Sequence, residues 1–528
     1  MKSTHSTPRA EARGMLRVNT ERRFLPRFKN RGLAPSNVSS AGQRIFLAVH
    51  QGFQARYLLR TDILTELKKR LERIVILTPN ADEDYFKREF EKDNVVVERF
   101  EMEKCEAYLN GSKGQRFFIL IRSFVLNGKY DIKTVDDHYR LFLRENAPKT
   151  WRGRVRSRQI HVLVKLLRAS KILRRLCLAL ENRLFVPDIH GALFAKYRPD
   201  MIVTTSLGNI GGGFDLFIMR EAKRHGAKVV PIILSWDNTT GKGLGGVIPD
   251  HTIVWTEIMK DELVRYHDIP PGRITVGGIA HFDIYYKPEM FLSKERLFAL
   301  LKLNPNRKLI FLATKSPTSY PWNADIVRLI AEAIRDGRIG PPAQLLVRLH
   351  PLHYVVKKSK AREHEYLFDE FTRLENDHPL VRIDRPEILS DRLTMDMPES
   401  EQVKLASILK HTDVLVNMFS TVNIEAAILD VPLVNVVFEG DPERRKKLRQ
   451  SIDIDLHQTH NQRIVASGAT RLCSTPEEMI AAINAYLKDR SLDKKKREAL
   501  VEQEAGPHKG TAGKNIAAVL CALGEARA

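Results

Sequence analysis

Three polar side chains in the second half of the chain lie at or just after the end of a short hydrophobic run. These side chains are Lys315, His350 and Ser420. Hydrophobic runs of this length are typical of buried parallel strands, and ligands of parallel sheets bind at the carboxyl ends of the strands. An ammonium, an imidazole and a hydroxyl at one such edge are donors for an anion. The sequence therefore predicts a phosphate site at this edge.

The segment DVLVNMFSTVNIEAAILDVPLVNVV, residues 413–437, predicts how one of these groups is positioned. It reads as a strand, a turn, a helix and a second strand. Ser420 or Thr421 stands where a helix N-cap belongs, so its hydroxyl and the first free N–H groups would point beyond the strand end. Such a helix start suits a phosphate. The alternative is that the hydroxyl only caps its own helix.

Strand patterns alternate with helical patterns along most of the chain, which predicts an α/β fold with two doubly wound parallel sheets. In the first half we expect strands at 44–50, 73–78, 94–98, 199–205, 228–234, 252–255 and 273–276. In the second half we expect them at 308–313, 344–349, 380–383 and 414–418, and again after Pro432. The predicted parts are a disordered basic arm (1–43), a first domain (44–285) with a helical insertion at about 100–185, and a second domain (286–528).

Three side chains of the first domain are candidates for a general base: His50, Asp215 and Asp237. A base acting on a hydroxyl must lie within hydrogen-bond reach of it. Asp237 is the first choice because it follows a strand beside Trp236, whose ring could stack on a sugar. The alternative is that Asp237 only holds its loop. The glycine-rich residues 239–246 that follow are predicted to form a mobile loop.

The composition limits the classes of protein that fit. A chain of 528 residues with 28% charged and 43% hydrophobic residues is globular, and its net charge of +22 predicts an anionic partner. The four cysteines are scattered, which indicates a reducing compartment. No hydrophobic run is long enough to span a membrane, and no signal peptide is recognisable. We therefore expect a cytoplasmic protein that can be peripheral to the inner face of a membrane.

No metal or other cofactor is expected. The one pair of carboxylates that resembles a metal site, Asp453 and Asp455, alternates like an exposed strand or turn. A nucleic-acid-binding protein would need basic and aromatic residues interleaved on one ordered face or a known reader motif. The sequence shows neither, so no nucleic acid is expected as a partner.

The stretch from Trp151 to Leu184 is unusually basic and hydrophobic at once. Its arginines and lysines are interleaved with leucine, isoleucine and valine, which indicates a basic amphipathic helix or helical hairpin. Such a helix can attach to an anionic membrane surface. Arg168, Arg174 and Arg175 would then contact the membrane. The alternative is a solvated face of an ordinary helix.

Several motifs together resemble GT-B fold transferases of bacterial surface polysaccharide synthesis. They are SWDN (235–238) with TGKGL, VWTEIM, IPPGRI leading to GGIAHFD, RLHP (348–351) and STVNIEA (420–426). Relatives of that family include the CDP-glycerol glycerophosphotransferases and the polysialyltransferases and, more distantly, the UDP-N-acetylglucosamine 2-epimerases. The resemblance covers about residues 45–520.

The resemblance implies two Rossmann-like domains facing across a cleft and a nucleotide-sugar donor. By it His350, Ser420 and Thr421 would bind the donor's phosphates, and Glu425 would meet the ribose or the nucleotide edge. Lys315 joins this donor site through its own position after a strand end. The implied reaction moves a sugar to a surface polysaccharide or a lipid-linked acceptor. Phe419 stands where the glycerophosphate enzymes have tyrosine or serine, which leaves a CDP-polyol phosphotransferase open. A UDP-sugar 2-epimerase and a non-catalytic sugar-nucleotide sensor also stay open.

Overall fold

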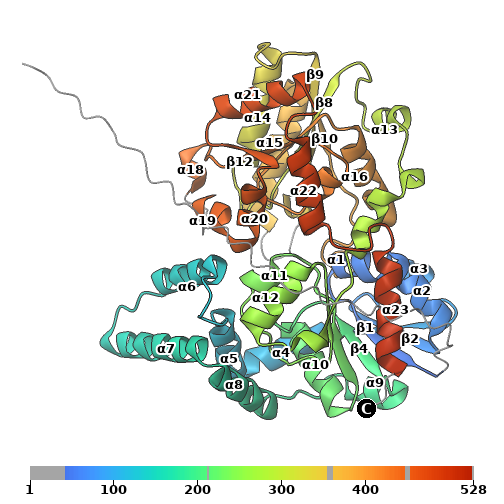
Figure 1. The fold of residues 1–528 in the computed structure, drawn as a ribbon, viewed down its shortest axis with the longest axis vertical. Helices are drawn as coiled ribbons and strands as arrows, with labels where there is room; N and C mark the ends of the chain where they lie inside the picture. The colour runs from blue at the N-terminus through green and yellow to red at the C-terminus, as the bar shows by residue number, and fades with distance from the viewer. Residues whose placement is uncertain (1–41, 211–212, 354–360, 446–451, 526–528) are drawn as a thin grey trace, which may run out of the picture. The chain divides into compact units, whose positions relative to one another are not determined.

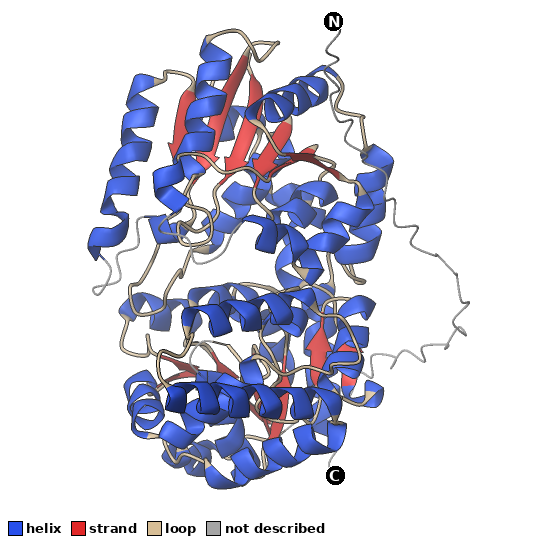
Figure 2. Cartoon of the chain, turned by 90° about the vertical axis from the view of Figure 1, so that its left-hand side faces the viewer, coloured by secondary structure: helices blue, strands red, loops and turns tan. Residues whose placement is uncertain are grey.

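The computed structural model describes residues 42–210, 213–353, 361–445 and 452–525 (Figure 1). Residues 1–41, which make up nearly all of the predicted arm, lie outside the described residues. The described chain forms two parallel α/β sheets with helices on either side of the strands (Figure 2). The predicted α/β class with two parallel-sheet domains is confirmed.

The first sheet has the strand order β3-β2-β1-β4-β5, with β1 at its centre. Its strands are β1 (Arg44–Ala48), β2 (Arg73–Thr78), β3 (Val95–Arg99), β4 (Met201–Thr204) and β5 (Lys228–Pro231). A separate parallel pair is formed by β6 (Thr252–Val254) and β7 (Ile274–Val276). Phe46 and Leu47 of β1 point to opposite faces and both are fully buried. Burial on both faces explains why this strand is hydrophobic throughout rather than alternating.

The helices of the first half surround this sheet and include the predicted insertion. They are α1 (Gly52–Gln54), α2 (Asp62–Arg70), α3 (Asp84–Phe90), α4 (Met102–Gly111), α5 (Lys113–Ser123), α6 (Lys133–Glu145), α7 (Trp151–Ala169), α8 (Lys171–Leu184), α9 (Gly191–Tyr197), α10 (Phe214–Arg224), α11 (Asn238–Gly241) and α12 (Glu257–His267). A 3-10 segment, Ala280–Tyr286, leads toward the second half.

The second sheet has the order β10-β9-β8-β11-β12-β13, all parallel. Its strands are β8 (Lys308–Ala313), β9 (Ala343–Arg348), β10 (Val381–Asp384), β11 (Val414–Asn417), β12 (Leu433–Val436) and β13 (Thr470–Cys473). Its helices are α13 (Lys294–Leu300), α14 (Asn323–Arg335), α15 (Ala361–Asp377), α16 (Glu399–His411), α17 (Val422–Ile428), α18 (Pro442–Arg445), α19 (Ile452–His457), α20 (Thr459–Ser467), α21 (Pro476–Lys488), α22 (Lys494–Glu504) and α23 (Ala512–Glu525). The edge strand β13 was not predicted, because only its ends are fully buried.

The two halves share contacts that fix the end of β1 against the second half. Gly52 donates its N–H to the carbonyl of Thr394 at 2.9 Å, and a Cβ at this position would lie 2.1 Å from the backbone nitrogen of Asp396. Glycine is therefore required for this close approach. Arg60 reaches the same loop and pairs with the buried Asp396 at 2.5 Å. The last helix, α23, returns to the 3-10 segment, where Asp283 accepts the N–H groups of its first residues.

The predicted helical insertion is confirmed as helices α4 to α8, but two arginines expected at a membrane surface were wrongly predicted. Arg174 is buried and donates to Asp268 at 2.7 Å and to the carbonyl of Leu167 at 2.9 Å. Arg168 pairs with Asp136 at 2.5 Å. Both guanidinium groups face the protein because they stabilise carbonyls and carboxylates of neighbouring elements. Arg175 is exposed, as predicted.

Candidate functional site

The carboxyl edge of the first sheet brings two of the three predicted base candidates together. His50 follows β1, and Asp215 lies in the first turn of α10. The His50 Nε2 and Asp215 Oδ1 atoms are 2.9 Å apart, and both side chains are buried. The sequence could not show this pairing, because 165 residues separate the two positions.

Neighbouring groups hold the pair in one orientation. Asp215 Oδ2 accepts a hydrogen bond from Ser206 Oγ at 2.7 Å, and the Gln54 side-chain oxygen accepts the backbone N–H of His50 at 2.6 Å. Because a carboxylate only accepts, Asp215 assigns the imidazole proton to Nε2. The buried Nδ1 then carries the lone pair, and it has no hydrogen-bond partner among the described residues. His50 is thus an oriented imidazole whose buried Nδ1 is the nitrogen that Asp215 leaves unpaired.

Asp237, the first choice from the sequence, lies in a different setting. It precedes α11 and pairs with Lys242 at 3.3 Å. Burial raises the pKa of Asp237, but the charges of Lys242 and His460 outweigh it and lower the pKa to about 2. A carboxylate with so low a pKa is a weak proton acceptor near neutral pH. Trp236 is buried against His460 and Arg463, so its ring is not open to a sugar.

The glycine-rich residues 239–246 do not form the predicted mobile loop. They are buried almost throughout, and the Thr239 hydroxyl donates to Glu262 at 2.5 Å. A Cβ at Gly243 would lie 2.3 Å from the carbonyl oxygen of Arg122, and Gly243 also has a φ of +72°. The glycines are present because α5 passes close to this backbone, and not because the segment moves.

His350 lies at the end of β9 on the second sheet, and its protonation is fixed locally. The Leu352 N–H donates to His350 Nδ1 at 3.2 Å, and the Thr314 hydroxyl accepts the backbone N–H of His350 at 2.7 Å. Burial lowers the pKa of His350 to about 4. The ring is therefore neutral near pH 7 with its proton on Nε2, which makes it a hydrogen-bond donor for an anion rather than a charge.

Lys315 lies at the end of β8, next to His350. Its ammonium pairs with Asp455 of α19. Asp455 therefore belongs to a helix and not to the predicted exposed strand or turn, because one helical turn places it against the lysine. The backbone of Lys315 is held by Asn323, which accepts its N–H at 2.9 Å and donates to its carbonyl at 3.0 Å.

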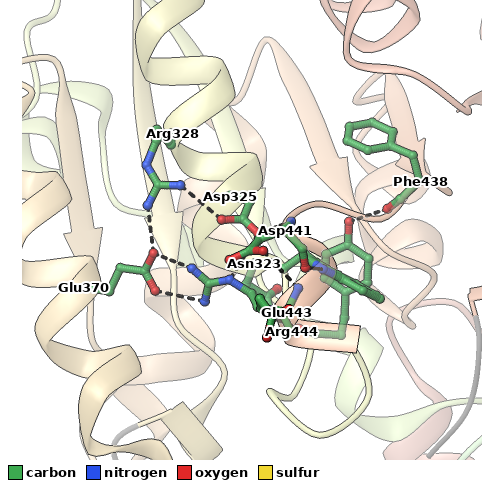
Figure 3. Close-up of polar contacts among 10 residues, drawn as sticks. Asn323, Asp325, Arg328, Glu370, Phe438, Asp441, Glu443 and Arg444 are labelled. Atoms are coloured by element: carbon green, nitrogen blue, oxygen red, sulfur yellow. Dashed lines mark hydrogen bonds and ion pairs between the residues drawn. The ribbon is translucent and has the colours of Figure 1, made fainter. Parts of the chain in front are cut away.

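A charged network holds the segment after β12 against α14 and α15 (Figure 3). Arg444 of α18 donates to Glu370 at 2.6 Å, and Glu370 also accepts from Arg328 at 2.8 Å. Asp325 accepts the Asp441 N–H at 3.1 Å and pairs with Arg328 at 3.0 Å (Figure 3). The network thus links α14, α15 and α18.

The turn between β11 and α17 differs in detail from its prediction. Thr421 occupies the N-cap position, but its side chain does not cap the helix. The Ser420 hydroxyl accepts from Asn417 Nδ2 at 3.1 Å and does not cap it either. Phe419 takes a φ of +47°, and its N–H is bound by Asn435 at 3.0 Å. Both hydroxyls are only partly buried, and the Thr421 hydroxyl forms a hydrogen bond with Glu425.

Glu425 lies one turn into α17, as predicted, and it is buried. It accepts a hydrogen bond from the Tyr285 hydroxyl of the 3-10 segment. Burial raises the pKa of Glu425. The charge of Arg348 opposes this rise, although Arg348 is itself held by Glu401 at 2.8 Å and by Asp384.

His460 is the residue that sequence reasoning missed. It lies on α20, with its ring 5.0 Å from that of Trp236. Burial lowers the pKa of His460 to about 4, and the charges of Asp237, Lys242 and Lys315 all act on it. It therefore lies near charged groups from both halves of the chain. Nothing in the sequence marks it, because no strand ends there.

The structure thus divides the predicted site into three groups. His50 and Asp215 form one pair, Asp237 and Lys315 both lie near His460, and Glu425 is held by Tyr285. His350 is linked to Lys315 through Thr314 and through His353, whose Nε2 is 3.0 Å from the Lys315 carbonyl. In the described ranges no group of three His, Cys, Asp or Glu side chains could hold a metal ion.

Comparisons with known proteins identify the fold. No family model matches the chain, and no curated protein matches its sequence. A putative UDP-N-acetylglucosamine 2-epimerase from Listeria monocytogenes has a similar structure, with a TM-score of 0.52 and 12% identity over 92% of this chain and 98% of that one. The UDP-GlcNAc 2-epimerase from Neisseria meningitidis bound to UDP-GlcNAc has a TM-score of 0.50 and 12% identity, over 91% of this chain and 100% of that one. The chain therefore has the two-domain GT-B fold that the resemblance predicted.

Proposed function

We propose that the protein is a glycosyltransferase that moves a sugar from a nucleotide-sugar donor to a polysaccharide or lipid-linked acceptor. The observation that carries the proposal is the His50–Asp215 pair, a buried imidazole with its proton directed to a carboxylate and its Nδ1 without a partner among the described residues. An imidazole oriented in this way is the usual general base toward a hydroxyl.

The donor is held at the edge of the second sheet. The neutral His350 donates from Nε2 to the diphosphate, and the Ser420 and Thr421 hydroxyls donate beside it. Lys315 supplies a positive charge to the diphosphate, and its ammonium also pairs with Asp455. Glu425 accepts from the ribose hydroxyls or the nucleotide edge. Fixed donors of this kind stabilise the charge that develops on the leaving phosphate.

The transfer step follows from these placements. The acceptor oxygen forms a bond to the anomeric carbon while the bond from that carbon to the phosphate oxygen breaks. The acceptor proton passes to His50 Nδ1, and Asp215 stabilises the imidazolium. The electron pair of the broken bond leaves with the nucleoside diphosphate, whose charge is met by His350 and Lys315. We expect no metal or other cofactor, since the nucleotide-sugar is a substrate.

A second candidate is a UDP-sugar 2-epimerase, because two solved structures that share this fold are described as such epimerases. An epimerase changes the donor without an acceptor. A CDP-polyol phosphotransferase is a third candidate, which the resemblance supports; it would consume a CDP-polyol instead of a nucleotide-sugar. The sequence motifs favour transfer over epimerisation.

The test begins with a thermal-shift screen against UDP, CDP, GDP and CMP conjugates. A ligand at a hundredfold excess over its Kd stabilises a protein by about 2.7 kcal/mol, which is readily seen. Consumption of the stabilising donor is then measured with and without membrane-derived acceptor. Glycosyl transfer predicts nucleotide release that depends on the acceptor. Conversion of the donor to a stereoisomer at the same rate without acceptor would establish the epimerase instead.

A further inference from the structure

The solvent-facing surface of α7 and α8 carries many large hydrophobic side chains. The described residues include twelve large hydrophobic side chains that are exposed, and nine of these lie on the two helices. They are Trp151, Val155, Val162, Leu166, Ile172, Leu173, Leu176, Leu180 and Leu184. Large exposed hydrophobic patches are rare on proteins that contact only water. This surface, which we call the hairpin face, therefore needs a partner.

The spacing of these side chains shows that α8 turns its hydrophobic side to solvent and its polar side to the protein, the reverse of an ordinary surface helix. Ile172, Leu176, Leu180 and Leu184 recur every four residues and share one side of the helix. Ile172 is 71% and Leu176 59% exposed. The opposite side is buried and polar: Arg174 pairs with Asp268 at 2.7 Å and Glu181 with Arg122 at 2.8 Å. Polar groups thus hold α8 to the protein and leave its hydrophobic side free.

α7 has a second hydrophobic stripe on its outer side, formed by Trp151, Val155, Val162 and Leu166. These four positions are four or seven residues apart, so they lie on one side of the helix. Val164 and Leu167, on the other side, are buried in the insertion. The buried side of α7 therefore makes its packing contacts with the protein, and the outer stripe takes no part in them. Figure 1 draws both helices at the margin of the first half, away from its sheet.

The charges on the hairpin face are all of one sign. Its exposed basic residues are Arg152, Arg154, Arg156, Arg158, Lys165, Lys171, Arg175 and Arg183. The only acidic residue between Trp151 and Leu184 is Glu181, which is fully buried. A second copy of this chain is thus a poor partner, because eight cations would meet eight cations in a protein whose net charge is already +22.

We propose that the hairpin face docks on an anionic lipid bilayer. The leucines and isoleucine enter the boundary between head groups and acyl chains, and the arginines and lysines on their flanks bind lipid phosphates. A nucleic acid would meet the cations but offers no hydrophobic layer for aliphatic side chains. None of the described helices could span a bilayer. The inference does not depend on which group the enzyme transfers.

Trp151 provides a direct probe of this docking in the full-length protein. The chain has four tryptophans, and Trp151 is 64% exposed, whereas Trp236, Trp255 and Trp322 are at most 4% exposed. On vesicles that contain phosphatidylglycerol, its emission is expected to shift to the blue and its quenching by acrylamide to fall. Phosphatidylcholine vesicles should cause neither change. The Trp151→Phe variant, which should still bind, must lose both signals.

Co-sedimentation with the same vesicles tests which side chains act. We expect the exposed-face variant Ile172→Ser/Leu176→Ser/Leu180→Ser to bind about a hundredfold more weakly, because three large side chains no longer leave water. The variant Arg154→Glu/Arg158→Glu/Arg175→Glu should bind weakly and lose most of the salt dependence. Residues 1–41 are present in the wild type and in every variant, so any contribution they make to vesicle binding is the same in all of them.

Control variants make the same kinds of substitution at exposed positions outside the hairpin face. Leu300→Ser removes a leucine that is 61% exposed on α13, and Lys410→Glu/Lys495→Glu/Lys514→Glu changes the net charge by the same amount as the arginine variant. Both controls should bind vesicles like the wild type. All variants should keep donor binding and melting temperature.

Equal binding by the serine variant and the wild type would overturn the proposal, as would equal losses in the controls. A serine variant that binds vesicles normally but changes oligomeric state would overturn it too, and would make this face a protein interface instead.

Discussion

The carboxyl edges of the two sheets carry the same kinds of side chain in opposite settings. On the first sheet, His50 is buried and oriented by Asp215. On the second, His350 is only partly buried, and a backbone N–H fixes its proton on the outer nitrogen. Among the described residues, the first imidazole therefore has an unpaired Nδ1, and the second directs its proton outward on Nε2. The comparison shows that the partner of each ring, and not the residue type, decides whether a strand-end histidine accepts or donates a proton.

The largest effect is expected at the first edge. In Asp215→Asn the amide N–H₂ faces His50 Nε2, which moves the imidazole proton to Nδ1 and removes the base. Ser206 can still donate to the amide oxygen, so the fold is kept. We expect kcat to fall roughly 10²- to 10⁴-fold with the melting temperature nearly unchanged. Turnover within about threefold of the wild type would remove His50 from the reaction.

A smaller effect is expected at the second edge. His350→Ala removes the Nε2 donor and should lower kcat/KM for the nucleotide-sugar about a hundredfold. His350→Gln places an amide N–H near the same position and should recover part of the loss, which a purely structural role of the ring would not predict. Ser420→Ala should act in the same direction with a smaller loss. Near wild-type turnover in both alanine variants would show that the phosphate site is misplaced.

His460 predicts an effect of pH on the free energy of unfolding. The pKa of His460 is lowered from 6.5 to about 4, mainly by burial. Between these values the unfolded chain binds a proton that the folded chain does not, so the free energy of unfolding falls as the pH falls from about 6.5 to about 4. The contribution is roughly 1–3 kcal/mol. Chemical denaturation of His460→Gln should show a correspondingly weaker loss over this range, and an identical pH profile would contradict the assignment.

The smallest effect is expected for Asp237→Asn, although the sequence made Asp237 the first candidate base. Its low pKa and its pairing with Lys242 make it a positioning group. We expect kcat to fall less than about tenfold, with the donor KM unchanged. A loss equal to that of Asp215→Asn would restore Asp237 as the base.

The sequence predicted the order and bounds of the strands better than the contacts between side chains. The strands β2 and β8 match their predicted bounds residue for residue, because buried parallel strands are continuous hydrophobic runs between polar turns. The positions of His50 and His350 after strand ends, and of Glu425 one turn into a helix, followed from these bounds. The pairing of His50 with Asp215 and the placement of His460 did not, because both depend on packing between distant segments. The burial of residues 239–246 was missed for the same reason, since glycine marks close packing as well as mobility.

In the proposed reaction the second sheet edge binds the donor and the first acts on the acceptor. Isothermal titration of the nucleoside diphosphate from the stabilising donor, into Asp215→Asn and His350→Ala side by side, tests it most directly. We expect a wild-type Kd for Asp215→Asn and a Kd raised at least about tenfold for His350→Ala. A raised Kd in Asp215→Asn together with an unchanged Kd in His350→Ala would contradict it.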